Sequence, residues 1–419
     1  MVRLTGLARA DVIAIRSGAS KAFWVLLDQG IFAVSNFIIN VLFARWLPAV
    51  DYGWFALSFS ISQFIGMLHF GVIQEPLLVQ SAQVDRDRHR PYIASLFRAH
   101  VLLLIGASAL GFVAWTIASR AGNPNLGWTI AGGLLGSIAL MTNLIGRRLC
   151  FIFISVRVSA IVGAAYLLGS VATGLVLHRF FTVWWVDIWL IIGGWSLIGS
   201  AITFWVAYAG TSGSRSYPLS EVLTSGKRYA RWGLAASFFG WLRYDGLFMM
   251  LAKFVGLEAV AETRAVFNLG SPMLQANMAA HVSALVGFSA DSRRGSKRNI
   301  WRIVGLYSLG MLVMLPVLSY FSPWLVNLFY HGRYETGAWQ LPLYCLALGL
   351  GVLDSIISSV FKAQGMMRAG YASIFITGFA SVGLGFLLIP LQHTLIYVFT
   401  LSAAIGLGSA LLLRMRATM

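Results

Sequence analysis

Charged residues are scarce in this sequence. Asp, Glu, Lys and Arg make up 11% of its 419 residues, whereas 58% are hydrophobic and the mean hydropathy is +0.77. Charged residues are about a quarter of an average soluble protein, because a solvated surface requires them. The composition therefore excludes a soluble enzyme and predicts an integral membrane protein that crosses the bilayer many times.

Cysteine and acidic residues are also rare. The two cysteines, Cys150 and Cys345, lie at the end of one apolar segment and within another, which predicts neither a disulfide framework nor a thiolate metal site. The 14 acidic residues stand against 31 basic ones, giving a formal charge of +17. The basic residues are spread between apolar segments, which is typical of membrane topology, so we expect no nucleic-acid partner.

Motifs of catalysis are missing as well. The sequence contains no HExxH, GxSxG, P-loop or CxxC motif. The predicted outer loops are short, which argues against a membrane glycosyltransferase, polymerase or ligase. We therefore expect no enzymatic activity, no cofactor and no metal ion, and the remaining chemistry is translocation.

Apolar segments of membrane-spanning length recur along the chain and predict an all-α fold with about twelve transmembrane helices. Most Lys and Arg residues fall on one side of this layout, which places both termini in the cytoplasm. The polar segment 209–231 predicts a cytoplasmic loop between two six-helix bundles, 1–208 and 232–419, around a central cavity. The predicted spans are 22–47, 53–80, 93–118, 127–146, 159–177, 183–208, 232–254, 260–286, 303–328, 339–361, 371–390 and 394–413.

The first span carries polar groups that a lipid-facing anchor would lack. At 100° per residue, Gln29, Asn36 and Asn40 fall within about 40° of one another, with Asp28 to the side. We interpret the three amides as candidates for substrate contact, although hydrogen bonding between neighbouring helices explains them equally well. A carboxylate at this depth in the membrane must form an ion pair, be protonated or be hydrated in a cavity.

The seventh and eighth spans are as polar as the first two. Arg243 and Asp245 lie two residues apart, about 200° around a helix, so each must find a partner elsewhere. Arg264, Asn268 and Gln275 form one stripe on the eighth span. Both arginines are candidates to bind an anionic substrate; the alternatives are a structural ion pair for Arg243 and snorkelling for Arg264.

Acidic groups within spans are the candidates for coupling to an ion. Asp28, Glu75 and Asp245 could each bind a proton or a sodium ion, and no spacing selects between the two. His69 is also able to carry a proton, but we interpret it, like Asp354, as a packing group with hydrogen bonds.

The residues at the beginning of the chain carry a family resemblance. The run LLDQGIFAVSNFIINVLFARWLPAVDYGWFAL from Leu26 to Leu57, followed by GVIQEPLLV from Gly71 to Val79, resembles the polysaccharide flippases. These belong to the multidrug/oligosaccharidyl-lipid/polysaccharide (MOP) exporter superfamily. Over the rest of the chain the resemblance is architectural, with Tyr229-Ala230-Arg231-Trp232 leading into the seventh span as in that family.

The resemblance implies a multi-pass transporter of the bacterial inner membrane with two bundles arranged as a V. Such a protein moves a polyprenyl-pyrophosphate-linked oligosaccharide from the inner to the outer leaflet by alternating access, next to polysaccharide polymerase and export machinery. Lipid II flippases usually have more than twelve spans, so we expect an exopolysaccharide, capsule or O-antigen precursor here.

Two other functions fit the same residues. A cation-coupled multidrug exporter of the same superfamily predicts that acidic groups dominate the cavity. A non-transporting scaffold of a polysaccharide-synthesis complex predicts that changes to cavity residues leave function intact.

Overall fold

The computed structural model describes residues 23–24, 27–28, 30–31, 33–74, 77, 81, 84–213, 215–271, 298–363 and 366–418. Within these ranges the regular elements are helices, and no strand occurs. Nine described helices are long and apolar enough to cross a membrane. The chain is therefore an all-α, multi-pass membrane protein, as its composition predicts.

The helices follow one another with short connections. After a first helix that includes Ala33–Trp46, the amino-terminal half contains α2 (Ala49–His69), the π-helical η1 (Phe70–Gln74), η3 (Arg86–Arg88), α4 (His89–Arg120), α5 (Pro124–Leu149), the π-helical η4 (Cys150–Ile154), α6 (Val156–Phe180) and α7 (Trp185–Ala209). The carboxyl-terminal half contains α8 (Leu219–Arg243), α9 (Gly246–Phe254), a helix over residues 257–271, α11 (Arg298–Tyr330), η5 (Glu335–Gly337), α12 (Gln340–Ala363), α13 (Met367–Gln392) and α14 (Ile396–Thr418).

The nine candidate spans coincide with nine of the twelve predicted ones. The other three are the predicted spans 22–47, 232–254 and 260–286. The first is described as the helix Ala33–Trp46, the second is interrupted, and the third is described only over 257–271.

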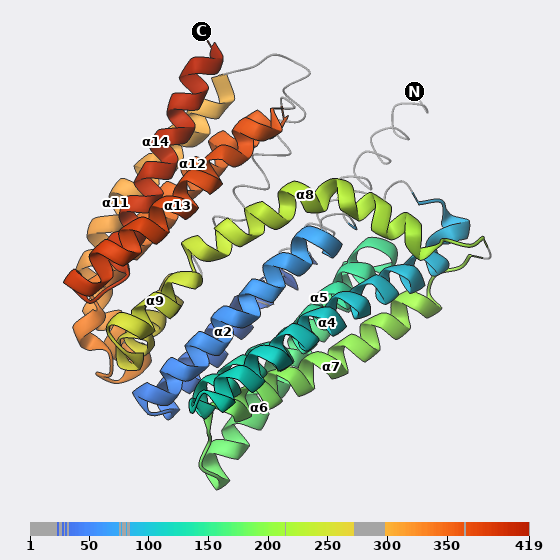
Figure 1. Ribbon diagram of the computed structural model, residues 1–419, viewed down its shortest axis with the longest axis horizontal. Helices are drawn as coiled ribbons and strands as arrows, with labels where there is room; N and C mark the ends of the chain where they lie inside the picture. The colour runs from blue at the N-terminus through green and yellow to red at the C-terminus, as the bar shows by residue number, and fades with distance from the viewer. Residues whose placement is uncertain are drawn as a thin grey trace, which may run out of the picture.

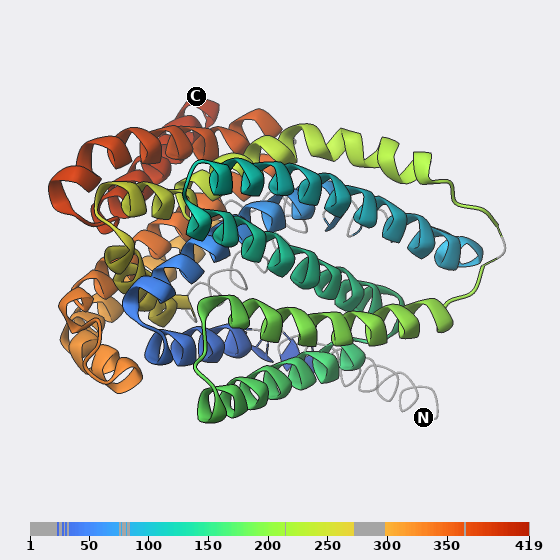
Figure 2. The same cartoon turned by 60° about the horizontal axis from the view of Figure 1, so that its bottom comes forward.

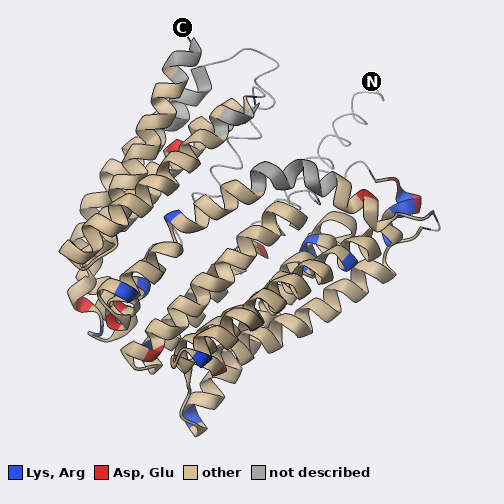
Figure 3. Cartoon of the chain, in the orientation of Figure 1, with Lys and Arg blue, Asp and Glu red and all other residues tan. Residues whose placement is uncertain are grey.

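The helices form two groups that converge at one end. Figure 1 shows α2 and α4 to α7 in one group, here called the amino-terminal group, and α11 to α14 in the other, the carboxyl-terminal group. The two groups meet near α9 and diverge toward the carboxyl terminus. Figure 3 shows that charged residues gather mostly near helix ends and leave the long middle stretches uncharged. With the orientation that the basic residues predict, the groups meet at the outer end and separate toward the inner end.

Helix α8 links the two groups and differs from prediction. The loop predicted at 209–231 is shorter than expected, because α8 begins at Leu219 directly after Pro218. From there α8 packs against α2 in one group and against α13 in the other, and Figure 2 shows it reaching from one to the other. The helix ends at Arg243, and α9 begins only at Gly246, so the predicted span 232–254 is broken in its middle.

Close packing in the amino-terminal group centres on Trp189. Its buried indole donates a hydrogen bond to Ser58 Oγ on α2 at 2.7 Å and covers Gly136 of α5. A Cβ atom placed on Gly136 would lie 2.1 Å from two ring carbons of Trp189. This glycine therefore allows α5, α7 and α2 to approach one another.

We expect Gly136→Ala to lower the free energy of unfolding by about 1 to 3 kcal/mol, because the added methyl group overpacks the contact with Trp189. The measurement is the thermal unfolding midpoint in detergent. Gly106→Ala on α4 is the matched control, since a Cβ there meets no atom within 4 Å and alanine favours the helix. Equal midpoints for the two variants would contradict the packing of α5 on α7.

Candidate functional site

The break between α8 and α9 places two charged residues at the middle of a span. Tyr244 and Asp245 interrupt the helix, and they lie between Arg243 and the start of α9 at Gly246. Interrupted helices at membrane depth free backbone groups and are tolerated where protein or water surrounds them. As their spacing predicts, Arg243 and Asp245 each have an ion-pair partner on another helix.

Asp245 pairs with Arg264 on the helix 257–271. Arg264 Nη1 lies 3.2 Å from Asp245 Oδ1, and the two side chains are 12% and 11% exposed. The guanidinium carbon lies 4.4 Å from the ring centroid of Phe59 on α2 and 5.4 Å from that of Phe248 on α9. Arg264 therefore lies between the two groups of helices and does not snorkel. Its Nε is buried and has no hydrogen-bond partner within the described ranges.

A hydrogen bond beside this pair also joins the two groups. Asn268, one turn beyond Arg264, donates from Nδ2 to the hydroxyl of buried Tyr52 on α2 at 2.8 Å. The predicted polar stripe on the eighth span thus faces α2 at these two positions.

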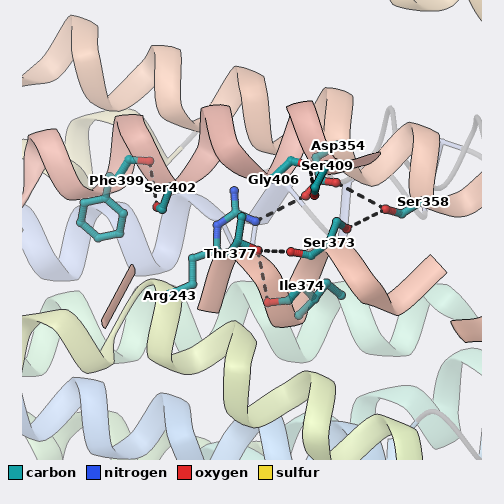
Figure 4. Close-up of polar contacts among 10 residues, drawn as sticks. All are labelled: Arg243, Asp354, Ser358, Ser373, Ile374, Thr377, Phe399, Ser402, Gly406 and Ser409. Carbon is teal, nitrogen blue, oxygen red and sulfur yellow. Dashed lines mark hydrogen bonds and ion pairs between the residues drawn. The ribbon is translucent and has the colours of Figure 1, made fainter. Parts of the chain in front are cut away.

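Arg243 points into the carboxyl-terminal group. Figure 4 shows its guanidinium directed at Asp354 of α12, with Nη1 at 3.6 Å from Oδ2. Ser358 donates to Asp354 Oδ1 at 3.4 Å and is 3.0 Å from the hydroxyl of Ser373 on α13. Arg243 Nη2 is buried and finds no hydrogen-bond partner in the described part of the chain, and a Cβ on Gly351 would lie 3.2 Å from it. Asp354, which the sequence suggested was only a packing group, is therefore the partner of a candidate substrate residue.

Asp28 is neutralised inside the amino-terminal group. Arg147 Nη2 lies 2.5 Å from Asp28 Oδ1, and Ser159 donates to the same oxygen at 2.8 Å. Arg147, which directly follows the predicted span 127–146, is 5% exposed. The sequence signal for this pair is weak, because an arginine at a span end is usually solvated.

The remaining candidates are placed in part. Asn40 donates from Nδ2 to the backbone oxygen of Asn36 at 2.8 Å, and its buried Oδ1 has no hydrogen-bond partner that the structure describes. Gln29, Glu75 and Gln275 lie outside the described residues.

The outer end holds the two groups together through Arg333, which lies between α11 and η5. Its guanidinium donates to the backbone oxygens of Arg45 at 2.5 Å, Leu47 at 2.8 Å and Ala44 at 3.3 Å. The hydroxyl of Tyr334 donates to Ala44 as well, at 3.3 Å. These are carbonyls at the carboxyl end of the first helix, which lack partners within the helix and attract a cation.

Backbones also touch at this end. A Cβ on Gly53 of α2 would lie 2.4 Å from the carbonyl oxygen of Leu257. The contact is possible only because position 53 has no side chain. Together with Arg333 it closes the outer end in the structure described here.

No protein-family model matches the sequence, and no curated protein matches it. Solved structures do match, over almost the whole chain. A MOP superfamily transporter from Pyrococcus furiosus is 10% identical and superimposes with a TM-score of 0.67, covering 95% of this chain and 94% of its own. The lipid II flippase MurJ in an inward closed conformation is 12% identical and superimposes with a TM-score of 0.64, covering 96% of this chain and 88% of its own. A point mutant of the Vibrio cholerae MATE transporter VcmN is 14% identical and superimposes with a TM-score of 0.59, covering 96% of this chain and 98% of its own. The chain therefore has the fold of MOP superfamily transporters.

Proposed function

We propose that this protein flips a polyprenyl-pyrophosphate-linked oligosaccharide, a precursor of exopolysaccharide, capsule or O-antigen, across the bacterial inner membrane. The headgroup enters between the two helix groups at the inner end, where they diverge. The groups then rock about their contacts, the outer end opens, and the polyprenyl tail stays in lipid. Polysaccharide polymerase and export proteins would use the product at the outer face.

One observation carries the choice of an anionic substrate. Arg243 and Arg264 each retain a buried guanidinium N–H group, at Nη2 and Nε respectively, without an acceptor among the residues that the structure describes. A buried donor without a partner costs about 1 to 3 kcal/mol and more when charged. Phosphate oxygens are the strongest acceptors for guanidinium groups, so a pyrophosphate would supply what these two residues lack.

A multidrug exporter is the competing function, and one feature favours it. The charges of Arg243 and Arg264 are balanced by Asp354 and Asp245, so the two pairs together carry no net charge. A lipophilic cation could displace an arginine from its carboxylate. The two functions differ in the sign of charge that the substrate must carry.

The test uses the full chain reconstituted in liposomes with two probes: a fluorescent polyprenyl pyrophosphate oligosaccharide and a lipophilic cationic dye. We expect protein-dependent movement of the oligosaccharide across the bilayer, measured by its accessibility to an external oxidant, because phosphate complements the unpartnered donors. The dye should equilibrate no faster than in empty liposomes.

Movement of the dye alone would replace the flippase by a drug exporter. Movement of neither probe by correctly folded protein would favour a scaffold. A polyprenol-linked oligosaccharide without the pyrophosphate is the control for recognition of the anion.

A further inference from the structure

Two histidines that transport by Arg243 and Arg264 does not use meet inside the amino-terminal group. His69 at the end of α2 and His100 of α4 are fully buried, and His69 Nε2 lies 2.8 Å from His100 Nδ1. Their rings are nearly perpendicular, with centroids 4.9 Å apart. The sequence shows two isolated histidines 31 positions apart, and only the fold brings them together.

The pair belongs to a longer chain of hydrogen bonds. Arg148 Nε donates to Gln74 Oε1 at 3.1 Å, and Gln74 Nε2 is 3.0 Å from His69 Nδ1. At the other end, His100 Nε2 is 3.1 Å from Thr142 Oγ1, and Thr142 donates to the backbone oxygen of Ile138 at 2.6 Å. The chain leads from a half-buried arginine near the inner end of α5 to a fully buried pair.

The chemistry of its ends gives every bond in this chain the same direction. The guanidinium of Arg148 can only donate, so the oxygen of Gln74 faces it and the amide N–H faces His69. Thr142 donates its proton to a carbonyl, so it accepts from His100 Nε2. His100 Nδ1 is then an acceptor, and His69 donates to it from Nε2. Both imidazoles are therefore neutral in this arrangement.

Adding one proton to the two histidines reverses the hydrogen bonds that Gln74 makes. If His69 takes it, Nδ1 becomes a donor and opposes the amide N–H of Gln74. If His100 takes it at Nδ1, His69 must move its own proton from Nε2 to Nδ1, with the same consequence. In both cases the Gln74 amide turns over and its oxygen leaves Arg148. A second proton is excluded, because two imidazolium rings in contact repel each other.

The two residues that separate in this change, Gln74 and Arg148, lie close to α8, the helix that connects the two halves. Gln74 ends the π-helical η1, which packs against α8, and Arg148 lies just before Cys150–Ile154, the π-helical η4. Single π-helical turns within longer helices are frequent at functional sites. Among the described charges on these elements, Arg147 pairs with Asp28 and Glu221 of α8 with Arg88. Arg90 of α4 donates to the backbone oxygens of Tyr208 and Thr211, and Arg98 of α4 is exposed.

We propose that His69 and His100 bind the single proton that couples this transporter to the proton gradient, a proposal that rests on the transport function above. The proton is shared at the bond between the two rings. Its arrival turns Gln74, releases Arg148 and loosens the packing of η1 on α8, which connects the two helix groups. The coupling ion is therefore a proton bound by imidazoles.

Proton binding is tested first without substrate. In the reconstituted full chain with 15N-labelled histidine, we expect the His69 and His100 signals to change together between about pH 8 and pH 5 and to account for one proton in total. His69→Gln and His100→Gln assign the signals, and in each the remaining histidine should titrate alone. Two imidazoles that stay neutral over this range, or that titrate independently in the unaltered protein, would overturn the proposal.

Coupling is tested second, with the oligosaccharide probe. For one proton per cycle, a pH difference of one unit should shift the steady-state distribution of the probe about tenfold. In the double variant His69→Gln/His100→Gln this shift should vanish while downhill movement continues; exposed His178→Gln is the control. A double variant that keeps the tenfold shift refutes the histidine site. If the unaltered protein moves no oligosaccharide, the proposed function fails, and the titration alone decides on the proton site.

Discussion

Replacing Arg264 by alanine is expected to abolish movement of the oligosaccharide and to destabilise the protein by about 3 to 5 kcal/mol, because Asp245 is left buried and unpaired. The stability loss comes from a carboxylate 11% exposed that has no other ion-pair partner among the described residues. The transport loss comes from the guanidinium between the two helix groups. Unfolding midpoint and flipping rate measure the two effects separately.

A double variant separates transport from stability. Arg264→Gln/Asp245→Asn removes both charges and retains hydrogen-bonding groups of similar size, so the unfolding midpoint should recover most of the loss. Flipping should stay absent, because the amide carries no positive charge for the pyrophosphate. The matched control is Arg88→Gln/Glu221→Gln, an ion pair between η3 and the start of α8 with side chains 22% and 45% exposed, worth about 0 to 1 kcal/mol. If Arg264→Gln/Asp245→Asn flips the probe at the unaltered rate, Arg264 does not bind substrate.

The second large effect concerns the outer end. Arg333→Ala removes the guanidinium that donates to the backbone oxygens of Ala44, Arg45 and Leu47. Hydrogen bonds from a charged group contribute about 1.5 to 3 kcal/mol each, so even one of them shifts a two-state equilibrium about tenfold or more. We expect the variant to populate a conformation in which the outer ends have separated.

The measurement is the distance between spin labels at Val50 of α2 and Glu258 of the helix 257–271, both exposed and on opposite sides of the contact. Buried Cys150 and Cys345 are first replaced by alanine. A longer distance should appear in Arg333→Ala, and in Gly53→Ala for a different reason, since its methyl group collides with the backbone of Leu257. Arg120→Ala, at the outer end of α4, is the control. Unchanged distances in both variants would show that these contacts do not close the outer end.

The membrane-spanning layout was predictable because length and hydropathy are local properties. Nine spans lie where apolar runs predict them, and Arg243 and Asp245 have separate partners, as expected from their spacing, although the helix itself is interrupted between them. The break after Arg243 was not predictable, because Tyr244 and Asp245 carry no proline or glycine signal before Gly246.

Partners of the polar residues required the fold. Arg147 resembles the solvated end of a span, and its burial against Asp28 depends on α5 and the first helix lying together. Asp354 and Arg243 are far apart in the sequence, and His69 acquires a partner only when α4 packs beside α2. Composition identifies which residues are costly in a membrane, but long-range contacts decide how that cost is offset.

The helical nature of α8 limits how the halves can move. A helix of 25 residues is roughly 37 Å long along its axis, and Figure 1 shows α8 curving from one group to the other, whereas a slack tether would let the halves drift apart freely. Because α8 packs against α2 in one group and against α13 in the other, we expect it to limit how far the two groups can separate. We expect the hinge at the interruption of Tyr244 and Asp245, where α8 meets α9. Asp245 lies at this hinge and forms an ion pair with Arg264. We therefore expect a substrate that draws Arg264 away to act directly on the hinge.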